Sequence, residues 1–368
     1  MSFKRGGVRM QIDFHHAVTY VLARLAGFNY DQANIIAYSS QYVDDSNCEV
    51  FVKFNNGALY KPICSAHKVL DYRNFDQLAD HLVWAPFHFL PGNNGLRNDE
   101  GQEDNFVSRI ICRPNSYVAQ DMVSECIRNR KTENSLHRLG ITLHVYADTW
   151  AHQGFAGIQD DVNSVNYLED DETSQTLIGK LEEFFRDKFD RKQSRFVAGV
   201  SPLGHGAVLS YPDIPYLKWK YEDNYGTIIK RNNPSDFLDA AQHMFKVMKR
   251  FLLADPNAEI PNMAEQDSKL LAELFQTITS SNGIERHQEW LKRIREGEFS
   301  FGAEEVYYDE NEWIHTALGS YLENIPFKKL KYEPNFLDTD WKKFQDALMD
   351  HHFYLLRVLF PKYDMCIA

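Results

Sequence analysis

Apolar residues recur at helical spacing along most of the chain, and short segments rich in Gly, Pro, Asn and Asp separate these stretches. Between residues 13 and 26 the apolar positions lie three or four residues apart, and Gly27 follows, as expected at the end of an amphipathic helix. Asp31 is the expected N-cap of a second helix. The same reasoning predicts helices at the following ranges: 32–43, 114–130, 133 to about 153, 175–190, 235–253, 263–279, 283–296, 310–323 and 338–359.

One segment departs from this helical pattern. In residues 47–64, the runs VFVKF and ALYKPI flank an Asn-Asn-Gly turn, which indicates a β-hairpin. Polar residues at 91–104 and acidic residues at 159–174 predict exposed loops. The expected fold class is therefore mainly α, a multi-helix bundle with a small β-hairpin and a helical C-terminal extension.

Length and composition fit a folded protein with a large core. The chain has 368 residues, of which 43% are hydrophobic and 14% aromatic. We expect two regions, a helical core at residues 11–232, which contains the candidate site described below, and a helical region at 233–368 that packs on it. The oligomeric state is left open.

The charge pattern limits the class of partner. The net charge is −12, and no run of Lys or Arg exceeds two residues, which argues against binding of duplex nucleic acid. Five cysteines without a C-x-x-C pair indicate reduced thiols. The N-terminal residues do not form a signal peptide, and no apolar stretch approaches the roughly 20 residues of a membrane span. We therefore expect cytoplasmic synthesis, with signal-independent export left open.

The most informative motif lies in the predicted helix at 133 to about 153. His144, Asp148 and His152 recur every fourth residue, so all three side chains lie on one helix face. Imidazole and carboxylate groups on a buried face are costly unless they have partners, and a divalent cation is the simplest common partner. The alternative is that they are polar residues of a solvated face, bonded to their neighbours.

Further histidines and aspartates lie in apolar or Gly- and Pro-rich surroundings. Taken singly, each is more often a core residue with satisfied hydrogen bonds, but together they could complete a cluster of about two or three metal ions. The candidates outside the central helix are His15, with His16 as the alternative, Asp44, His88, His205 and Asp213.

In their order along the chain, these motifs resemble the zinc-dependent phospholipase C and single-strand-specific nuclease superfamily, and are most similar to bacterial relatives of uncharacterised function. The resemblance covers roughly residues 11–220. It rests on DFHH, SQYVDD, PFHFLP and LHVYADTWAHQGF, although the spacing between Asp148 and His152 is shorter than is usual in that family. The resemblance implies an all-helical fold and these metal ligands: His15, Asp44, His88, His144, Asp148, His152, His205 and Asp213.

The resemblance also implies a function. We expect a zinc-dependent phosphodiester hydrolase with about two or three Zn²⁺ ions, in which Asp148 bridges two cations and Asp44 orients or deprotonates the attacking water. A phospholipid or other small phosphodiester is the favoured substrate, with peripheral contact to a membrane left open. The alternatives are a single-strand nuclease of the same fold, or a non-enzymatic binding or effector protein whose helices the metal stabilises.

Overall fold

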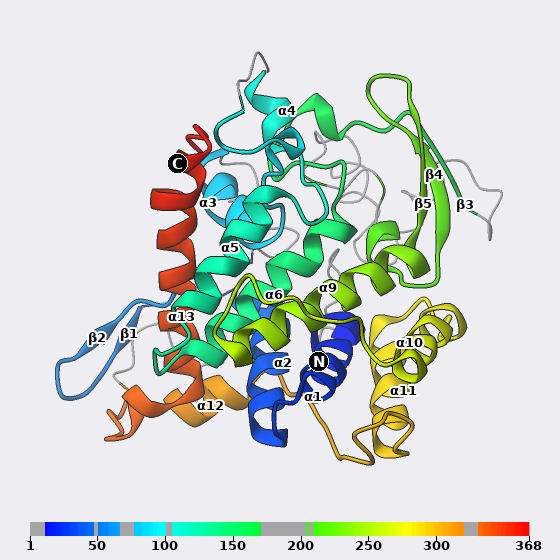
Figure 1. Cartoon of the computed structure of the whole chain (residues 1–368). Helices are drawn as coiled ribbons and strands as arrows, with labels where there is room; N and C mark the ends of the chain where they lie inside the picture. The colour runs from blue at the N-terminus through cyan, green and yellow to red at the C-terminus, as the bar shows by residue number, and fades with distance from the viewer. Residues whose placement is uncertain are drawn as a thin grey trace, which may run out of the picture.

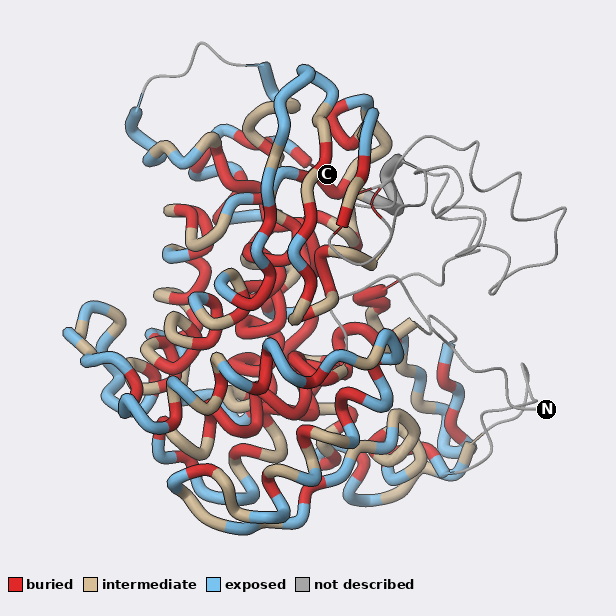
Figure 2. The backbone as a smooth tube through the Cα atoms, turned by 90° about the vertical axis from the view of Figure 1, so that its right-hand side faces the viewer, coloured by how far each residue is buried: buried red, intermediate tan, exposed pale blue. Residues whose placement is uncertain are grey.

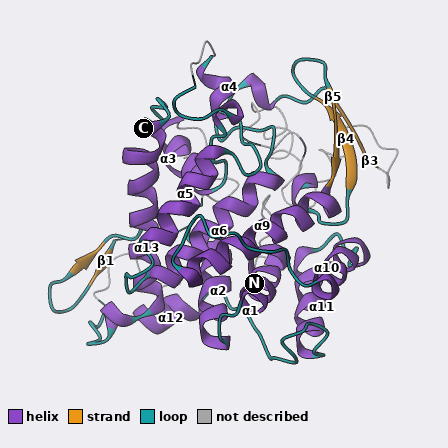
Figure 3. Cartoon of the chain, viewed as in Figure 1, coloured by secondary structure: helices purple, strands orange, loops and turns teal. Residues whose placement is uncertain are grey.

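The molecule is mainly helical, with one small sheet on either side of a helical body (Figure 3). This architecture confirms the predicted fold class. The computed structural model describes these residues: 12–47, 51–66, 77–100, 105–170, 204, 208, 210–319 and 330–367. The predicted helix at 175–190 and the candidate ligand His205 lie outside the described residues.

Helix α6 (Ser135–Ala151) is the central element. Every residue from His137 to Ala151 is buried, in keeping with a sequence that carries apolar side chains on several faces. The helix packs most extensively against four others, and Figure 1 shows it in the centre of the helical body. Figure 2 shows that the buried residues gather in the middle of the molecule. Those neighbours are α2 (Tyr30–Asp45), α5 (Tyr117–Arg128), α9 (Asn233–Leu253) and α13 (Asp340–Tyr354).

Helices α2 and α6 lie very close together at Gly140. A Cβ atom at this position would lie 2.4 Å from the carbonyl oxygen of Ile36 and 2.5 Å from Cβ of Ser39. No side chain fits there without a shift of the α2 backbone. Glycine therefore allows α2 to lie directly against α6, which places the last turn of α2 beside the second half of α6.

The first described segment is unusual. Residues Asp13–Val18 form a π-helix, η1, which continues into α1 (Thr19–Ala26). Gly27 ends α1 with φ +108°, as the glycine in the sequence predicted. π-Helical turns are rare and occur frequently at functional sites. All six residues of η1 are buried.

Helix α2 begins at Tyr30, so Asp31, which the sequence predicted as the N-cap, lies inside the helix. Asn29 is the N-cap instead: its side chain accepts a hydrogen bond from the Gln32 amide, and the Gln32 side chain accepts one from the Asn29 amide. This reciprocal arrangement is a capping box. Asp31 lies in the first turn, where its negative charge interacts favourably with the positive end of the helix dipole.

The predicted hairpin is present, and a second sheet was not expected. Strands β1 (Val52–Lys53) and β2 (Leu59–Tyr60) pair antiparallel. The second sheet has the antiparallel order β3-β4-β5, formed by Tyr167–Asp170, Lys218–Glu222 and Ile228–Asn232. The prediction of loop for 159–174 was therefore wrong at β3. Its four residues are joined to a strand about 50 positions later, a pairing that local pattern does not reveal.

The remaining elements complete the helical body and its connections. They are α3 (Gln77–Phe87), η3 (Asn93–Gly95), α4 (Phe106–Ile110), η4 (Asp161–Asn163), η6 (Tyr211–Asp213), α10 (Glu265–Thr277), α11 (Gly283–Arg295), α12 (Glu312–Leu318), η7 (Phe336–Asp338), η8 (Leu355–Leu359) and α14 (Phe360–Lys362). Among the described helices, none combines the length and the apolar character that crossing a membrane requires.

Contacts cross the predicted boundary between residues 232 and 233. Helix α9, just after the boundary, packs on α1 and α6. The ring centroid of Phe14 lies 5.0 Å from that of Phe237 and 5.9 Å from that of Phe275. One continuous hydrophobic cluster extends from Phe14 to Ile367. The division into two regions stays a prediction, and the two parts share this core.

A buried histidine at the α13–α3 contact gives the fold a pH dependence. His351 is fully buried, its Nε2–H donates to the Pro86 carbonyl, and its ring stacks on Phe87. Burial, together with the nearby charge of Arg138, holds the pKa of His351 well below the ordinary 6.5. The unfolded chain therefore binds a proton at this position in mildly acid solution, and the folded chain does not.

We expect the free energy of unfolding to fall as the pH drops below about 6.5, and His351→Gln, which keeps a donor for Pro86, to reduce that fall. Between pH 7 and pH 5, one such histidine costs about 2 kcal/mol. Urea unfolding of both proteins at the two pH values measures the difference. An equal loss of stability in wild type and variant would contradict the assignment to His351.

Candidate metal centre

The predicted ligands that the structure describes come together around Asp148, in the second half of α6. Their side chains are buried, with exposed fractions between 0% and 4%. They come from η1, the end of α2, the turn after α3, α6 and η6. These residues are His15, Asp44, His88, His144, Asp148, His152 and Asp213.

Four imidazoles surround the carboxylate of Asp148. Its Oδ1 lies 3.2 Å from Nε2 of His15. Its Oδ2 lies 3.3 Å from Nδ1 of His88, 3.4 Å from Nε2 of His144 and 3.7 Å from Nδ1 of His152. Both oxygens thus face ring nitrogens, and Asp148 is the residue through which the cluster is connected.

Three of these imidazoles donate a hydrogen bond to a backbone carbonyl. Nδ1 of His144 lies 2.7 Å from the Ser40 oxygen, and Nε2 of His88 lies 2.9 Å from the Ser65 oxygen. Nδ1 of His152 lies 2.7 Å from the carbonyl oxygen of His88. A carbonyl oxygen only accepts, so each of these nitrogens carries the proton. Metal-binding histidines are typically held in this way.

In a neutral ring, the nitrogen that does not donate to a carbonyl carries an unprotonated lone pair. Nε2 of His144 and Nδ1 of His88 lie 3.2 Å from each other and face Oδ2 of Asp148. Lone pairs aimed at one another and at a carboxylate repel unless a positive charge lies among them. The charge has two sources, a proton on a ring or a bound cation.

The pKa shifts of His152 and Asp148 also indicate that positive charge is stabilised in the cluster. Burial lowers the pKa of His152, but the carboxylates of Asp148 and Asp213 outweigh it and raise that pKa to about 9. Burial raises the pKa of Asp148, and the surrounding histidines outweigh it and hold the pKa well below 3.8. Burial and the neighbouring His144 lower the pKa of His15 to about 4. The cluster favours added positive charge while His15 stays neutral, as a metal ligand must.

Two overlapping triplets have the geometry of a metal site. In His15, Asp44 and His144, and again in His88, His144 and Asp148, one ligand atom from each residue lies within 4.8 Å of the others. The rings of His15 and His144 stack at 3.8 Å. Imidazole nitrogen with carboxylate oxygen is the donor set that suits Zn²⁺ and related ions. The residues present therefore fit a divalent metal.

The structure describes two of three further predicted ligands, His152, His205 and Asp213, which could together hold another metal ion. Nε2 of His152 lies 3.6 Å from Oδ1 of Asp213, a fully buried carboxylate in η6. The ring of Phe89 stacks on His152 with centroids 4.4 Å apart, and Gly204 lies against the far end of that ring. His205 follows Gly204 and is outside the described residues, so its place as a ligand stays a prediction.

Arg231, which the sequence analysis missed, fixes the end of α6. From β5, its guanidinium donates to the carbonyl oxygens of Trp150 at 2.9 Å and Ala151 at 3.3 Å, and it pairs with Asp236 at 3.0 Å. A cationic side chain at a helix C-terminus donates hydrogen bonds to the last carbonyls and interacts favourably with the negative end of the helix dipole. It therefore fixes the backbone just before His152. A single Arg in a short strand gave no signal in the sequence.

Two other histidines near the candidate ligands in the sequence, His16 and His137, have partners outside the cluster. His16 pairs with His287, their ring nitrogens 2.9 Å apart, so His15 is the member of the adjacent pair that faces Asp148. Nε2 of His137 lies 3.0 Å from the carboxylate of Asp340, near the opposite end of α6. His137 lies seven residues before His144 and therefore on the same helix face, but it is in the first turn of α6 and does not reach the cluster.

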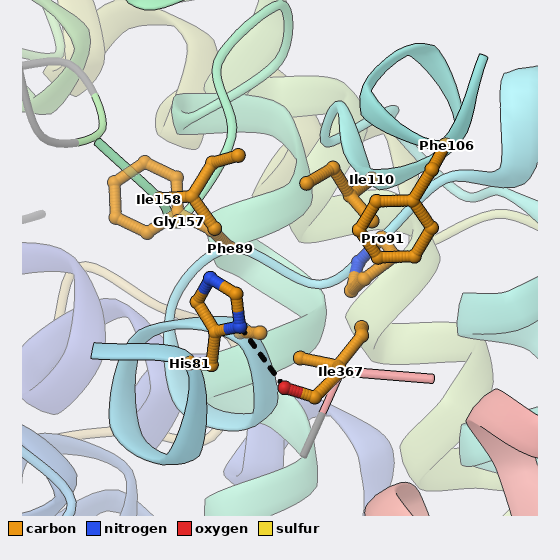
Figure 4. Close-up of a pocket in the computed structure, with 9 residues that line it drawn as sticks. His81, Phe89, Pro91, Phe106, Ile110, Gly157, Ile158 and Ile367 are labelled. Atoms are coloured by element: carbon orange, nitrogen blue, oxygen red, sulfur yellow. Dashed lines mark hydrogen bonds between the residues drawn. The ribbon is translucent and has the colours of Figure 1, made fainter. Parts of the chain in front are cut away.

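An apolar pocket lies beside Phe89, the residue whose ring stacks on His152 (Figure 4). Phe106, Ile110 and Ile158 contribute to its walls. The polar ring of His81 donates from Nδ1 to the Ile367 carbonyl at 3.0 Å. The lining residues that the structure describes include no Lys or Arg, and they are mostly apolar, unlike the residues of the cluster.

The fold and this site together define a mainly helical protein with a buried histidine–aspartate cluster. Over residues 10–359 the chain matches DUF6765, a family of unknown function. It belongs to that family. No curated protein matches the chain, and no solved structure matches it.

Proposed function

We propose that this protein is a metal-dependent phosphodiester hydrolase, similar in its chemistry to zinc-dependent phospholipase C. One observation carries the proposal. Asp148 lies among four buried imidazoles, and the outward nitrogens of His88 and His144 donate to carbonyls, so their lone pairs face inward. This arrangement favours a divalent cation over a plain hydrogen-bond network.

The residues of the chain would divide the work. Asp148 offers one oxygen toward His15 and the other toward His88 and His144, so it can bridge two cations. Bound divalent ions supply Lewis acidity for the phosphoryl group and make a water more acidic. Asp44, with Oδ1 4.0 Å from Nδ1 of His88, is at the edge of this arrangement and would orient the water or accept its proton.

The favoured substrate is a phospholipid or another small phosphodiester. The acidic net charge of −12 opposes long polyanions, and the sequence has no basic patch to bind their backbones. A single-strand nuclease of the same fold is the alternative within the enzyme class. A short single strand needs fewer phosphate contacts, so the charge argument is weaker there.

One observation favours a second, non-enzymatic function. The described ligands are at most 4% exposed, as in structural metal sites where protein atoms occupy every coordination position. The metal would then join η1, α2 and α6 in a binding or effector protein. Catalysis requires an open coordination position, so hydrolytic activity distinguishes the two functions.

The test is hydrolysis of bis-p-nitrophenyl phosphate, a phosphatidylcholine vesicle and a short single-stranded DNA by the zinc-loaded full-length protein. We expect turnover of at least one phosphodiester, its loss on chelation and its return when Zn²⁺ is restored. His243→Ala, a substitution at a partly exposed histidine on α9, is the control and should keep full activity. Stoichiometric metal without any turnover would favour the structural role.

A further inference from the structure

His15 is held differently from the other imidazoles of the metal centre. Neither of its ring nitrogens donates to a backbone carbonyl in the described part of the chain, whereas His88, His144 and His152 each do so. Its Nε2 lies 3.2 Å from Oδ1 of Asp148, the carboxylate that all four imidazoles share. Its ring stacks on that of His144 at 3.8 Å. Stacking and a contact with a shared carboxylate fix the ring less firmly than a hydrogen bond to a backbone carbonyl, so the position of His15 depends more on the backbone of η1.

Helix α11 contacts η1 on both sides of His15. Nε of Arg286 donates to Oδ2 of Asp13 at 2.6 Å, and both side chains are at most 1% exposed. The next residue, His287, places Nε2 2.9 Å from Nδ1 of His16. Two consecutive residues of α11 therefore hold the positions that flank His15, and a shift of η1 along its axis would break both contacts.

The same part of the chain also reaches the end of α2. The hydroxyl of Tyr308 donates to Oδ2 of Asp45 at 2.6 Å, and its ring lies 5.1 Å from that of His16. Asp45 also accepts from the side chain of Gln41 at 3.1 Å. Asp44 is the adjacent residue on α2. Tyr308 thus contacts the two elements that carry the first two candidate ligands.

Buried polar contacts between helices carry a desolvation cost that apolar contacts do not. Apolar side chains of similar size would pack without the cost of desolvating charged groups, but they would accept several registers. Buried polar pairs allow one arrangement, and a metal centre needs ligands held to within a fraction of an ångström. The choice of polar pairs beside His15 and Asp44 is explained if these contacts set ligand geometry.

We propose that Arg286, His287 and Tyr308 are positioning residues that hold η1 and the end of α2 for metal binding. The inference rests on the proposed metal centre and assigns a role to the C-terminal third of the chain. These residues do not touch the metal. They act through the backbone on either side of His15 and beside Asp44.

The test is metal affinity. Full-length protein is stripped with a chelator and titrated with Co²⁺ alone, and the visible absorption of the bound ion reports both affinity and coordination. In His287→Leu we expect affinity to fall about tenfold to a hundredfold and the absorption band to shift. His287→Gln, whose amide can still bond to Nδ1 of His16, should restore most of the affinity. Tyr308→Phe, which loses one hydroxyl, provides a second and gentler variant.

Thermal unfolding of the metal-free proteins separates positioning from plain stability. A merely structural contact would lower the melting temperature of the variants and leave Co²⁺ affinity unchanged. Wild-type affinity in both His287→Leu and Tyr308→Phe would therefore overturn the inference. Absence of Co²⁺ binding in wild type would overturn the metal centre and this inference together. Metal binding without phosphodiester turnover would overturn the proposed activity alone and leave the positioning role to be judged by the variants.

Discussion

Asp148→Asn is expected to abolish stoichiometric metal binding. The substitution keeps the size of the side chain but removes the charge that four imidazoles surround, so the cluster would lose its proposed bridging ligand. Metal analysis by plasma mass spectrometry should find about two or three zinc equivalents in wild type and less than about one in the variant. When the free metal concentration is a thousand times the Kd, each bound ion adds about 4 kcal/mol to the free energy of unfolding. Chelation should therefore lower the melting temperature of wild type but not of Asp148→Asn.

Asp267→Asn is the matched control for this experiment. Asp267 is a buried carboxylate, 2% exposed, that accepts hydrogen bonds from the amide and hydroxyl of Ser300 at 3.0 and 2.7 Å, outside the metal centre. The control should lose some stability and keep its metal. Equal metal content in Asp148→Asn and wild type, or no stoichiometric metal in either, would refute the metal centre.

Gly140→Ala is expected to destabilise the fold by forcing α2 and α6 apart. The added methyl would meet the Ile36 carbonyl oxygen at 2.4 Å and Ser39 Cβ at 2.5 Å, so α2 must move away from α6. Overpacking of this kind costs about 1–3 kcal/mol, and more where backbone must move. Because Ser40 and Asp44 move with α2, metal affinity should fall as well. Chemical unfolding and Co²⁺ titration of the same protein measure the two effects.

Gly57→Ala is the comparison for this substitution. Gly57 lies in the turn between β1 and β2, with φ +91° and no atom within 4 Å of the added methyl. It should cost only the strain of a left-handed backbone, about 1 kcal/mol, and leave metal affinity unchanged. A Gly140→Ala protein as stable as Gly57→Ala would show that α2 and α6 can separate without penalty.

The helices could be predicted because their signals are local. Apolar spacing and a terminal glycine placed α1 correctly, and similar spacing placed α9, α10, α11 and α13 to within a few residues. The three-stranded sheet was missed because its strands are short and β3 pairs with β4 across about 50 residues. Strand pairing at such separation depends on tertiary packing, which single-sequence periodicity does not contain.

For the candidate site, the four-residue spacing of His144, Asp148 and His152 was enough to place them together on one helix face. The approach of His15 and His88 to Asp148 was expected from the resemblance, and the structure brings them there. That these residues bind metal stays a prediction. The supporting residues were not predicted: Arg286 and His287 lie in GIERHQEWLKRIR, which has the composition of an exposed helix.

The contacts between η1 and α11 also bear on when the proposed metal centre could be assembled. Asp13 and Arg286 are 273 positions apart, and His16 and His287 are 271 apart. During synthesis the N-terminal segment leaves the ribosome first, long before α11 exists. The first ligand is therefore left without its support until most of the chain has been made. A metal bound at the proposed centre would then come from those available where the finished chain folds, rather than from those present when translation begins.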